Sequence, residues 1–158
     1  MQLVIKQKMF SLRDGFHVFD ENDNIKYMVK SELLSLGHKF HIYDTRGREV
    51  GVIRQKMMSL FGEFYVEIGG KQLGSIKKKF AMITPKYEVD FKGWKVRGDL
   101  MGWNYEIYDD FNQIARISKK FFHLTDTYVI DVFDSRDEIE CLMLVLAIDA
   151  ANCAQNNS

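Results

Sequence analysis

The chain has 158 residues, a length that suits one domain with a sizeable core. Its 22 basic residues balance its 22 acidic ones, so the net charge is zero. This balance excludes a bulk field that would draw the whole chain to nucleic acid or to a membrane, and any basic site must therefore be local. Two cysteines, Cys141 and Cys153, are too few and too close together for a disulfide framework, which indicates a reducing compartment.

The N-terminal segment contains Lys6 and Lys8, which interrupt its apolar residues before a signal-like core can form. We therefore expect a cytoplasmic protein. No stretch rich in Pro, Gly or Ser separates residues 1 to 135 into parts. The expected organisation is a single domain over residues 1–158, with strands over about residues 3–133 and a central helix over about residues 136–152.

Short runs of alternating polar and apolar residues follow one another along the chain. They are rich in Val, Ile, Phe and Tyr, and Asn, Asp or Gly interrupts them at short intervals. This pattern is typical of an antiparallel all-β domain. Glycines at Arg46-Gly47 and Gly69-Gly70 supply the positive φ of a tight turn, so the flanking runs predict β-hairpins.

Four of the predicted hairpins share one layout. Their first strands begin at Phe16, Phe40, Phe64 and Tyr105, and the first three starts are 24 residues apart. A repeated two-strand unit predicts either an open array or a closed barrel. About twelve strands and a single apolar helix favour a mainly β fold: a closed antiparallel barrel that encloses a hydrophobic C-terminal α-helix.

The expected helix begins at a capping box, with Ser135 at the N-cap and Glu138 at the third helical position. Its apolar residues go all the way round, so no single sheet face could cover it. The expected core residues of this helix are Leu142, Leu144, Val145, Leu146 and Ile148. The alternative is a membrane anchor. A membrane span needs ~20 apolar residues, whereas Glu140 and Asp149 bound this stretch closely.

Three small residues, Gly51, Gly74 and Ala115, occupy the same position in three of the repeated hairpins. Each lies two residues before an isoleucine that is expected to point inward, and so on the same strand face. A small side chain at this position lets a neighbouring backbone approach closely. We expect all three to face the central helix.

These features resemble the LURP-one-related family, a relative of the Tubby C-terminal domain and of phospholipid scramblases. The resemblance rests on the repeated aromatic-x-Ile/Val-x-Asp hairpins, second strands such as "VGVIRQK" and "LGSIKKK", and the final hydrophobic helix, and it spans roughly residues 3–153. It implies a twelve-stranded barrel threaded by its C-terminal helix. It also implies a phosphoinositide-binding or other membrane-surface role, although no ligand-binding motif matches residue by residue.

The residue patterns favour neither a cofactor site nor an enzyme. The four histidines, His17, His38, His41 and His123, lack the spacing of a metal site. Nucleophile-elbow, phosphate-loop and dinucleotide-binding motifs are absent from the sequence. Aspartates and glutamates gather in turns, where their side chains help to form the turn. We expect a protein with no metal, no cofactor and no catalytic residue.

Basic residues on the predicted strands are the only polar feature above background. Alternation along each strand places five of them on the outer face: Arg54, Lys56, Lys77, Lys79 and Lys120. Such a stripe could bind anionic phospholipid or phosphoinositide headgroups. The competing interpretation is that these are edge and solubility charges, which strands commonly carry.

The sequence therefore predicts a non-enzymatic binding or scaffold domain, with anionic phospholipid as the preferred partner at a membrane surface. The alternative is a small-molecule or protein-interaction scaffold with no membrane role. Nucleic-acid binding is disfavoured, since the net charge is zero and no RNA-binding motif is present. The sequence does not specify an oligomeric state.

Overall fold

The computed structural model describes residues 1–6, 15–34, 37–58, 62–79, 86–122 and 125–153. All twelve strands in this part of the chain belong to one antiparallel sheet, in the order β8-β7-β6-β5-β4-β3-β2-β1-β12-β11-β10-β9. The strands are β1 (Gln2–Ile5), β2 (Phe16–Asp20), β3 (Ile25–Leu34), β4 (Gly37–Asp44), β5 (Glu49–Gln55), β6 (Glu63–Ile68), β7 (Lys71–Lys79), β8 (Lys86–Phe91), β9 (Lys95–Asp99), β10 (Asn104–Asp109), β11 (Asn112–Phe122) and β12 (Thr125–Val132).

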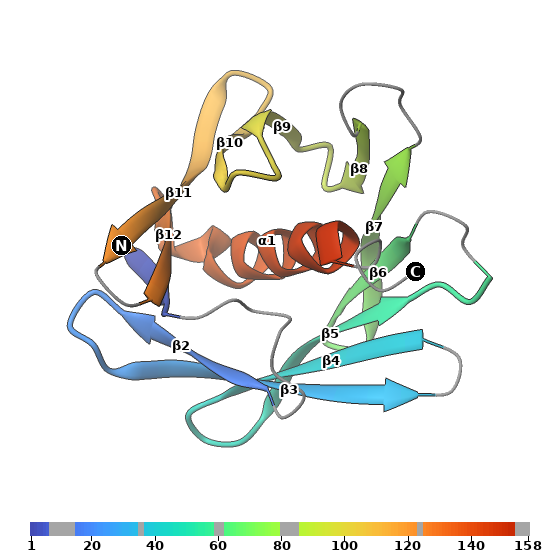
Figure 1. Ribbon diagram of the computed structural model, residues 1–158, viewed down its shortest axis with the longest axis horizontal. Coiled ribbons are helices and arrows are strands. Elements are labelled where there is room, and N and C mark those ends of the chain that lie inside the picture. The colour runs from blue at the N-terminus through green and yellow to red at the C-terminus, as the bar shows by residue number, and fades with distance from the viewer. Residues whose placement is uncertain (7–14, 35–36, 59–61, 80–85, 123–124, 154–158) are drawn as a thin grey trace.

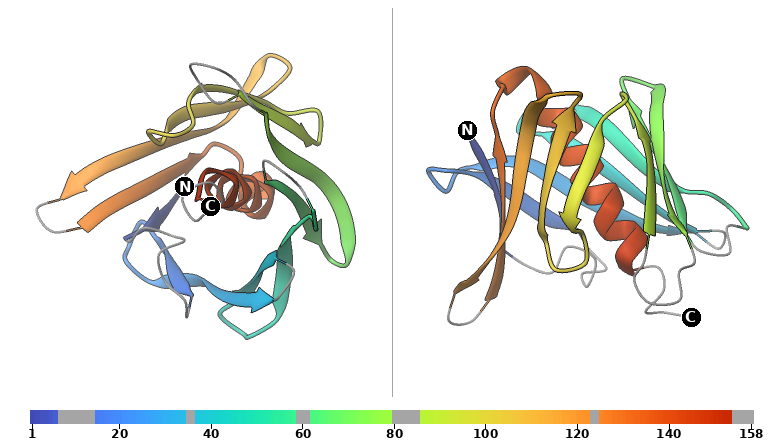
Figure 2. Two further views of the ribbon diagram at one scale, coloured as in Figure 1. Left: turned by 45° about the vertical axis from the view of Figure 1, so that its right-hand side comes forward. Right: turned by 90° about the horizontal axis from the view of Figure 1, so that it is seen from above.

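The sheet curls into a barrel around a single helix, α1 (Glu138–Cys153), as Figures 1 and 2 show. Because consecutive strands run in opposite directions, the connections alternate between the two ends of the barrel. The connection from β12 leads into the N-terminal end of α1, and the β9–β10 turn lies at its C-terminal end, where Asn152 contacts Leu100. The predicted twelve-stranded β fold with a central helix is confirmed.

The core of the barrel is built around α1. The five predicted core residues of the helix, Leu142, Leu144, Val145, Leu146 and Ile148, are at most 1% exposed. Alternate strand residues such as Ile53, Ile76 and Ile117 point toward them and are fully buried. Cys141 is also a buried thiol, and burial raises its pKa well above the ordinary value. The side chain of Cys153 lies outside the described part of the structure.

The four repeated hairpins share a β-bulge at the same place. In each pair the register shifts once, after Val18, Ile42, Val66 and Ile107 respectively. The extra residue on the second strand is Lys26, Val50, Leu73 or Ile114. A bulge bends its strand and increases the local twist, so four equivalent bulges help the sheet to close around the helix.

The start of the helix differs from the predicted capping box. Ser135 is not the N-cap; Ser135–Asp137 form a short 3-10 turn, and α1 begins at Glu138. Asp134 caps this turn, because its carboxylate accepts a hydrogen bond from the backbone N–H of Arg136 at 2.9 Å. The Glu138 carboxylate does not close a capping box, since it is held instead by two side chains from β3.

The three small residues do not share one role. Gly51 faces the helix as predicted, since a Cβ built there would lie 2.6 Å from the terminal methyl of Met143. The prediction for Gly74 is wrong: a Cβ there would meet the backbone of Asp90 and Phe91 on β8, not the helix. Ala115 is fully buried within the core.

The barrel is nearly closed rather than closed. In the part of the chain that the structure describes, β8 and β9 are the two ends of the sheet and pair only with β7 and β10. We call the unpaired junction between β8 and β9 the seam, and the helix bridges it with polar contacts. Asn152 accepts a hydrogen bond from the Tyr87 hydroxyl on β8 and donates one to the Leu100 carbonyl just after β9, at 3.1 Å. At the other end, Lys92 in the β8–β9 turn lies 3.3 Å from the Glu140 carboxylate.

No helix among the described residues combines the length and the apolar character needed to cross a membrane.

Candidate functional site

Four of the five predicted basic residues lie near one another on the outer face of the barrel. Arg54 is at the end of β5 and Lys56 directly follows it, and Lys77 and Lys79 are at the end of β7, with only β6 between the two strands. All four side chains are exposed, so the predicted outward orientation is confirmed. Lys78, between the last two, points the other way and is 3% exposed.

Lys120 does not belong to this group. It is exposed, but it lies on β11, and the sheet order places β8, the seam, β9 and β10 between β7 and β11. The stripe that the sequence predicts is therefore divided between two sides of the barrel.

Acidic residues on the neighbouring strands partly neutralise the four grouped cations. Arg54 forms an ion pair with Glu67, Lys56 with Glu63 at 3.0 Å, and Lys79 with Glu88 at 2.7 Å. A hydrogen bond to the Glu63 carboxylate raises the pKa of Lys56, and the hydrogen bond from Lys79 lowers the pKa of Glu88. Exposed ion pairs of this kind contribute little to folding and are screened by salt.

Two further cations adjoin the group and give it a net positive charge. Lys39 on β4 is directly opposite Arg54, and Lys86 at the start of β8 is directly opposite Lys79. Directly opposite residues project from the same face, and two like charges in that position destabilise the sheet. We define Lys39, Arg54, Lys56, Lys77, Lys79 and Lys86 as the basic patch.

The basic patch follows the ends of β4 to β8 that surround the C-terminal end of α1 (Figure 2). Lys39 and Lys86 were not predicted, because the alternation along one strand does not reveal which residue it faces on the next. Counting outward from the turn at Arg46-Gly47 would have paired Lys39 with Ile53, because the bulge at Val50 adds one residue to β5 and shifts the register by one.

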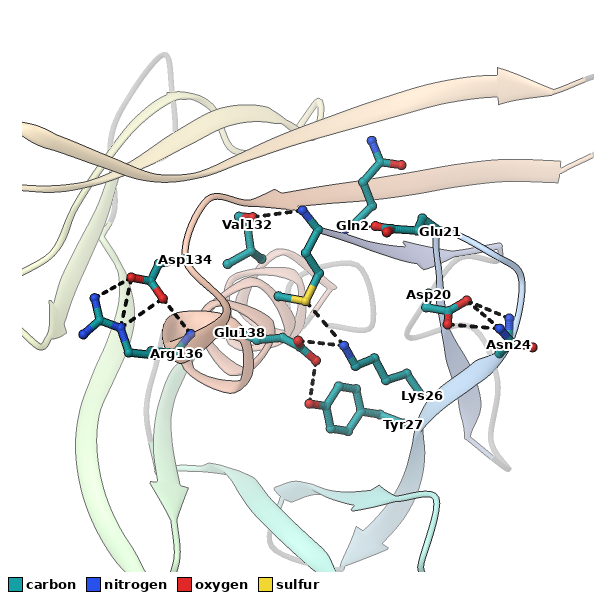
Figure 3. A network of polar contacts seen from close by, with 11 residues as sticks. Gln2, Asp20, Glu21, Asn24, Lys26, Tyr27, Val132, Asp134, Arg136 and Glu138 are labelled. Carbon is teal, nitrogen blue, oxygen red and sulfur yellow. Dashed lines mark hydrogen bonds and ion pairs between the residues drawn. The ribbon is translucent and has the colours of Figure 1, made fainter.

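A second polar cluster lies at the other end of the barrel, where α1 begins (Figure 3). The Glu138 carboxylate accepts hydrogen bonds from the Lys26 ammonium and the Tyr27 hydroxyl, each at 2.7 Å. Burial, followed by the bond to Glu138, raises the pKa of Tyr27. Glu138 is only 7% exposed, so these contacts supply the partners that a buried charge requires.

These contacts between Glu138, Lys26 and Tyr27 fix the start of the helix relative to β3. Lys26 and Tyr27 occupy the bulge position at which the second hairpin has Val50 and Gly51. An apolar residue and a small residue are thus replaced by the two groups that bind Glu138. Comparing the repeats in the sequence could have singled out this pair, but it could not have identified Glu138 as its partner.

The described residues contain no group of three or more side chains arranged to hold a metal ion. The lysines of the basic patch offer a different chemistry, which is electrostatic attraction of an anion. Ammonium groups are compact charges with several hydrogen-bond donors, and phosphate oxygens are suitable acceptors for them.

Comparisons with known proteins agree with this architecture. The sequence model of the family described as LURP-one-related matches residues 1–149. An uncharacterized protein of Bacillus subtilis, YxjI, is 30% identical over 149 residues, which cover 94% of this chain and 92% of the relative. The X-ray structure of a protein from Arabidopsis thaliana has a similar fold, with a TM-score of 0.59, 17% identity, and coverage of 94% of this chain and 90% of that one.

Proposed function

Because the chain belongs to the LURP-one-related family, we propose that it is a non-catalytic binding domain whose ligand is the anionic phospholipid surface of a membrane. The family and the barrel fold support a non-catalytic domain. The expected place of action is the cytoplasmic leaflet, where anionic lipids attract basic protein segments.

The observation that carries the proposal is the pairing of like charges in the basic patch. Lys39 opposes Arg54 and Lys79 opposes Lys86, although a sheet is more stable with opposite charges in such positions. A surface of phosphate groups would relieve both repulsions at once. Six cations outnumber the three ion-paired acids and Glu32, which is directly opposite Lys39 on β3, so the patch stays positive in a chain whose net charge is zero.

Replacing Lys77 and Lys79 with glutamate should abolish most of the binding to anionic vesicles. A lysine near an anionic membrane contributes ~1 kcal/mol, and two reversed charges add repulsion, so partitioning should fall by on the order of a hundredfold. The measurement is flotation with phosphatidylcholine vesicles, with and without phosphatidylserine or a phosphoinositide, at low and physiological salt. Thermal stability should change little, because the substituted side chains are exposed.

The matched control is Lys71→Glu with Lys95→Glu. Both residues are exposed, and they start β7 and β9 at the opposite end of the barrel, so the control changes net charge equally. An equal loss of binding in the control would show a bulk charge effect and contradict the assignment to the basic patch. A wild-type chain that floats with none of the anionic vesicles contradicts the proposed function and leaves the alternative of a scaffold with no membrane role.

A further inference from the structure

Two exposed methionines directly follow the basic patch along the chain. Met57 and Met58 form the turn after β5, next to Lys56, and their side chains are 55% and 99% exposed. The backbone at this turn is anchored, since the Lys56 N–H donates a hydrogen bond to the Glu63 carbonyl at 2.7 Å. The turn therefore holds two flexible apolar side chains in solvent at the margin of a positive surface.

The backbone of Met58 is in an unfavourable conformation. Its φ is +60°, in the left-handed region where glycine and asparagine are the usual residues. A methionine here gains nothing from burial, because its side chain is almost fully exposed. Folding therefore does not explain this residue type, and unexplained strain of this kind is a reason to seek a binding role.

The surroundings of Met58 distinguish it from Phe111, the other large apolar side chain that is almost fully exposed among the described residues. Phe111 is 98% exposed at the β10–β11 turn, at the opposite end of the barrel, and it follows Asp109 and Asp110. An anionic membrane would repel that acidic turn. Next to Met57 and Met58, in contrast, the basic patch would attract the membrane. Apolar side chains beside basic residues are the combination by which peripheral proteins enter the lipid interface.

We infer that Met57 and Met58 insert into the interfacial region of an anionic bilayer while the basic patch lies against its headgroups. The C-terminal end of α1 then faces the membrane, and the hairpin turns at the opposite end face away from it. This inference rests on the proposed function and adds to it the part of the fold that enters the lipid.

The first test is Met58→Asn, which removes the apolar side chain but tolerates the positive φ. Partitioning to phosphatidylserine vesicles should weaken about tenfold, equivalent to about 1.4 kcal/mol, while the unfolding temperature stays the same or rises. The control, Phe111→Asn, removes an equally exposed apolar side chain from the acidic β10–β11 turn. This variant should bind as tightly as the wild type.

The second test locates the side chain directly. An environment-sensitive fluorophore is attached to Met58→Cys in a Cys153→Ser background, where the remaining native thiol, Cys141, is buried. Its emission should shift to the blue on phosphatidylserine vesicles and be quenched by brominated acyl chains, whereas the same label on Phe111→Cys should not respond. If the wild type binds but the label at residue 58 stays aqueous and Met58→Asn binds normally, the inference fails and the proposed function stands. If the wild type binds no anionic vesicle, the proposed function fails.

Discussion

Asp149 is a carboxylate inside the barrel, in the last turns of α1. It is 6% exposed, and the loss of hydration raises its pKa to about 7, although a hydrogen bond from Trp103 opposes the shift. The Tyr105 hydroxyl is also buried and has no hydrogen-bond partner among the described residues. Asp149 is therefore protonated in the folded state over a pH range in which it is ionised in the unfolded chain.

Asp149→Asn should stabilise the protein at neutral and alkaline pH. The pKa rises from 3.8 in the unfolded chain to about 7 in the folded state, so the stability linked to this proton is complete below about pH 4 and is lost as the pH rises to about 7. Asparagine preserves the shape without ionising. We expect a gain on the order of 2 to 4 kcal/mol near pH 8 and little difference near pH 4.

The measurement is urea unfolding of both proteins across this pH range. Other carboxylates titrate in the variant and the wild type alike, so the difference between the two curves isolates Asp149. A difference that does not depend on pH would show that Asp149 is ionised in the folded state.

Gly74 and Gly51 differ in what a new Cβ atom would contact, and therefore in how much an alanine should destabilise the protein. Gly74→Ala would place a Cβ against the backbone of Asp90 and Phe91, which cannot move without opening the β7–β8 pair. We expect a loss of ~1 to 3 kcal/mol in unfolding free energy. Gly51→Ala would overlap the end of the Met143 side chain, which can change rotamer, and would lie 3.2 Å from the Glu67 carbonyl oxygen, which needs only a small shift, so it should cost less than ~1 kcal/mol. Urea unfolding of the two variants tests this order, and the reverse order would contradict it.

The elements themselves were predictable because their signals are local. Alternation, turn glycines and the recurrence of one hairpin identify the strands, and the unbroken apolar run identifies the helix. The start of the helix was not predictable in the same way. Ser135 and Glu138 have the spacing of a capping box, but the Glu138 carboxylate binds Lys26 and Tyr27, more than a hundred residues away. The spacing of Ser135 and Glu138 cannot reveal that distant side chains, rather than the helix backbone, bind the Glu138 carboxylate.

At the scale of the molecule, the sequence indicated that the helix is enclosed, but it did not indicate that the first and last strands of the described sheet are not paired with each other. Twelve strands suggested closure, whereas the sheet ends at β8 and β9 and α1 bridges the seam through Asn152. The basic patch was likewise only partly predictable. The outward direction of Lys77 and Lys79 follows from alternation, but the neighbours Lys39 and Lys86 depend on register, and Lys120 is remote because the seam interrupts the sheet.

The central helix should be indispensable to the barrel. Its six large apolar side chains, Leu142, Met143, Leu144, Val145, Leu146 and Ile148, are at most 1% exposed. Burying them contributes on the order of 10 to 20 kcal/mol as an upper bound, against a total stability of about 5 to 15 kcal/mol for a typical domain. A chain that ends at residue 134 should therefore lose its packed core and be insoluble.

The measurement is the solubility and near-UV circular dichroism of residues 1–134 beside the full chain. Leu144→Asp provides a test at full length, because its buried carboxylate would have no partner and should abolish cooperative unfolding, whereas Leu144→Met should remain folded. If the helix were instead a membrane anchor, truncation would release a soluble, folded β-domain. A soluble truncated chain with the near-UV spectrum of the full protein would show that the barrel stands without its helix.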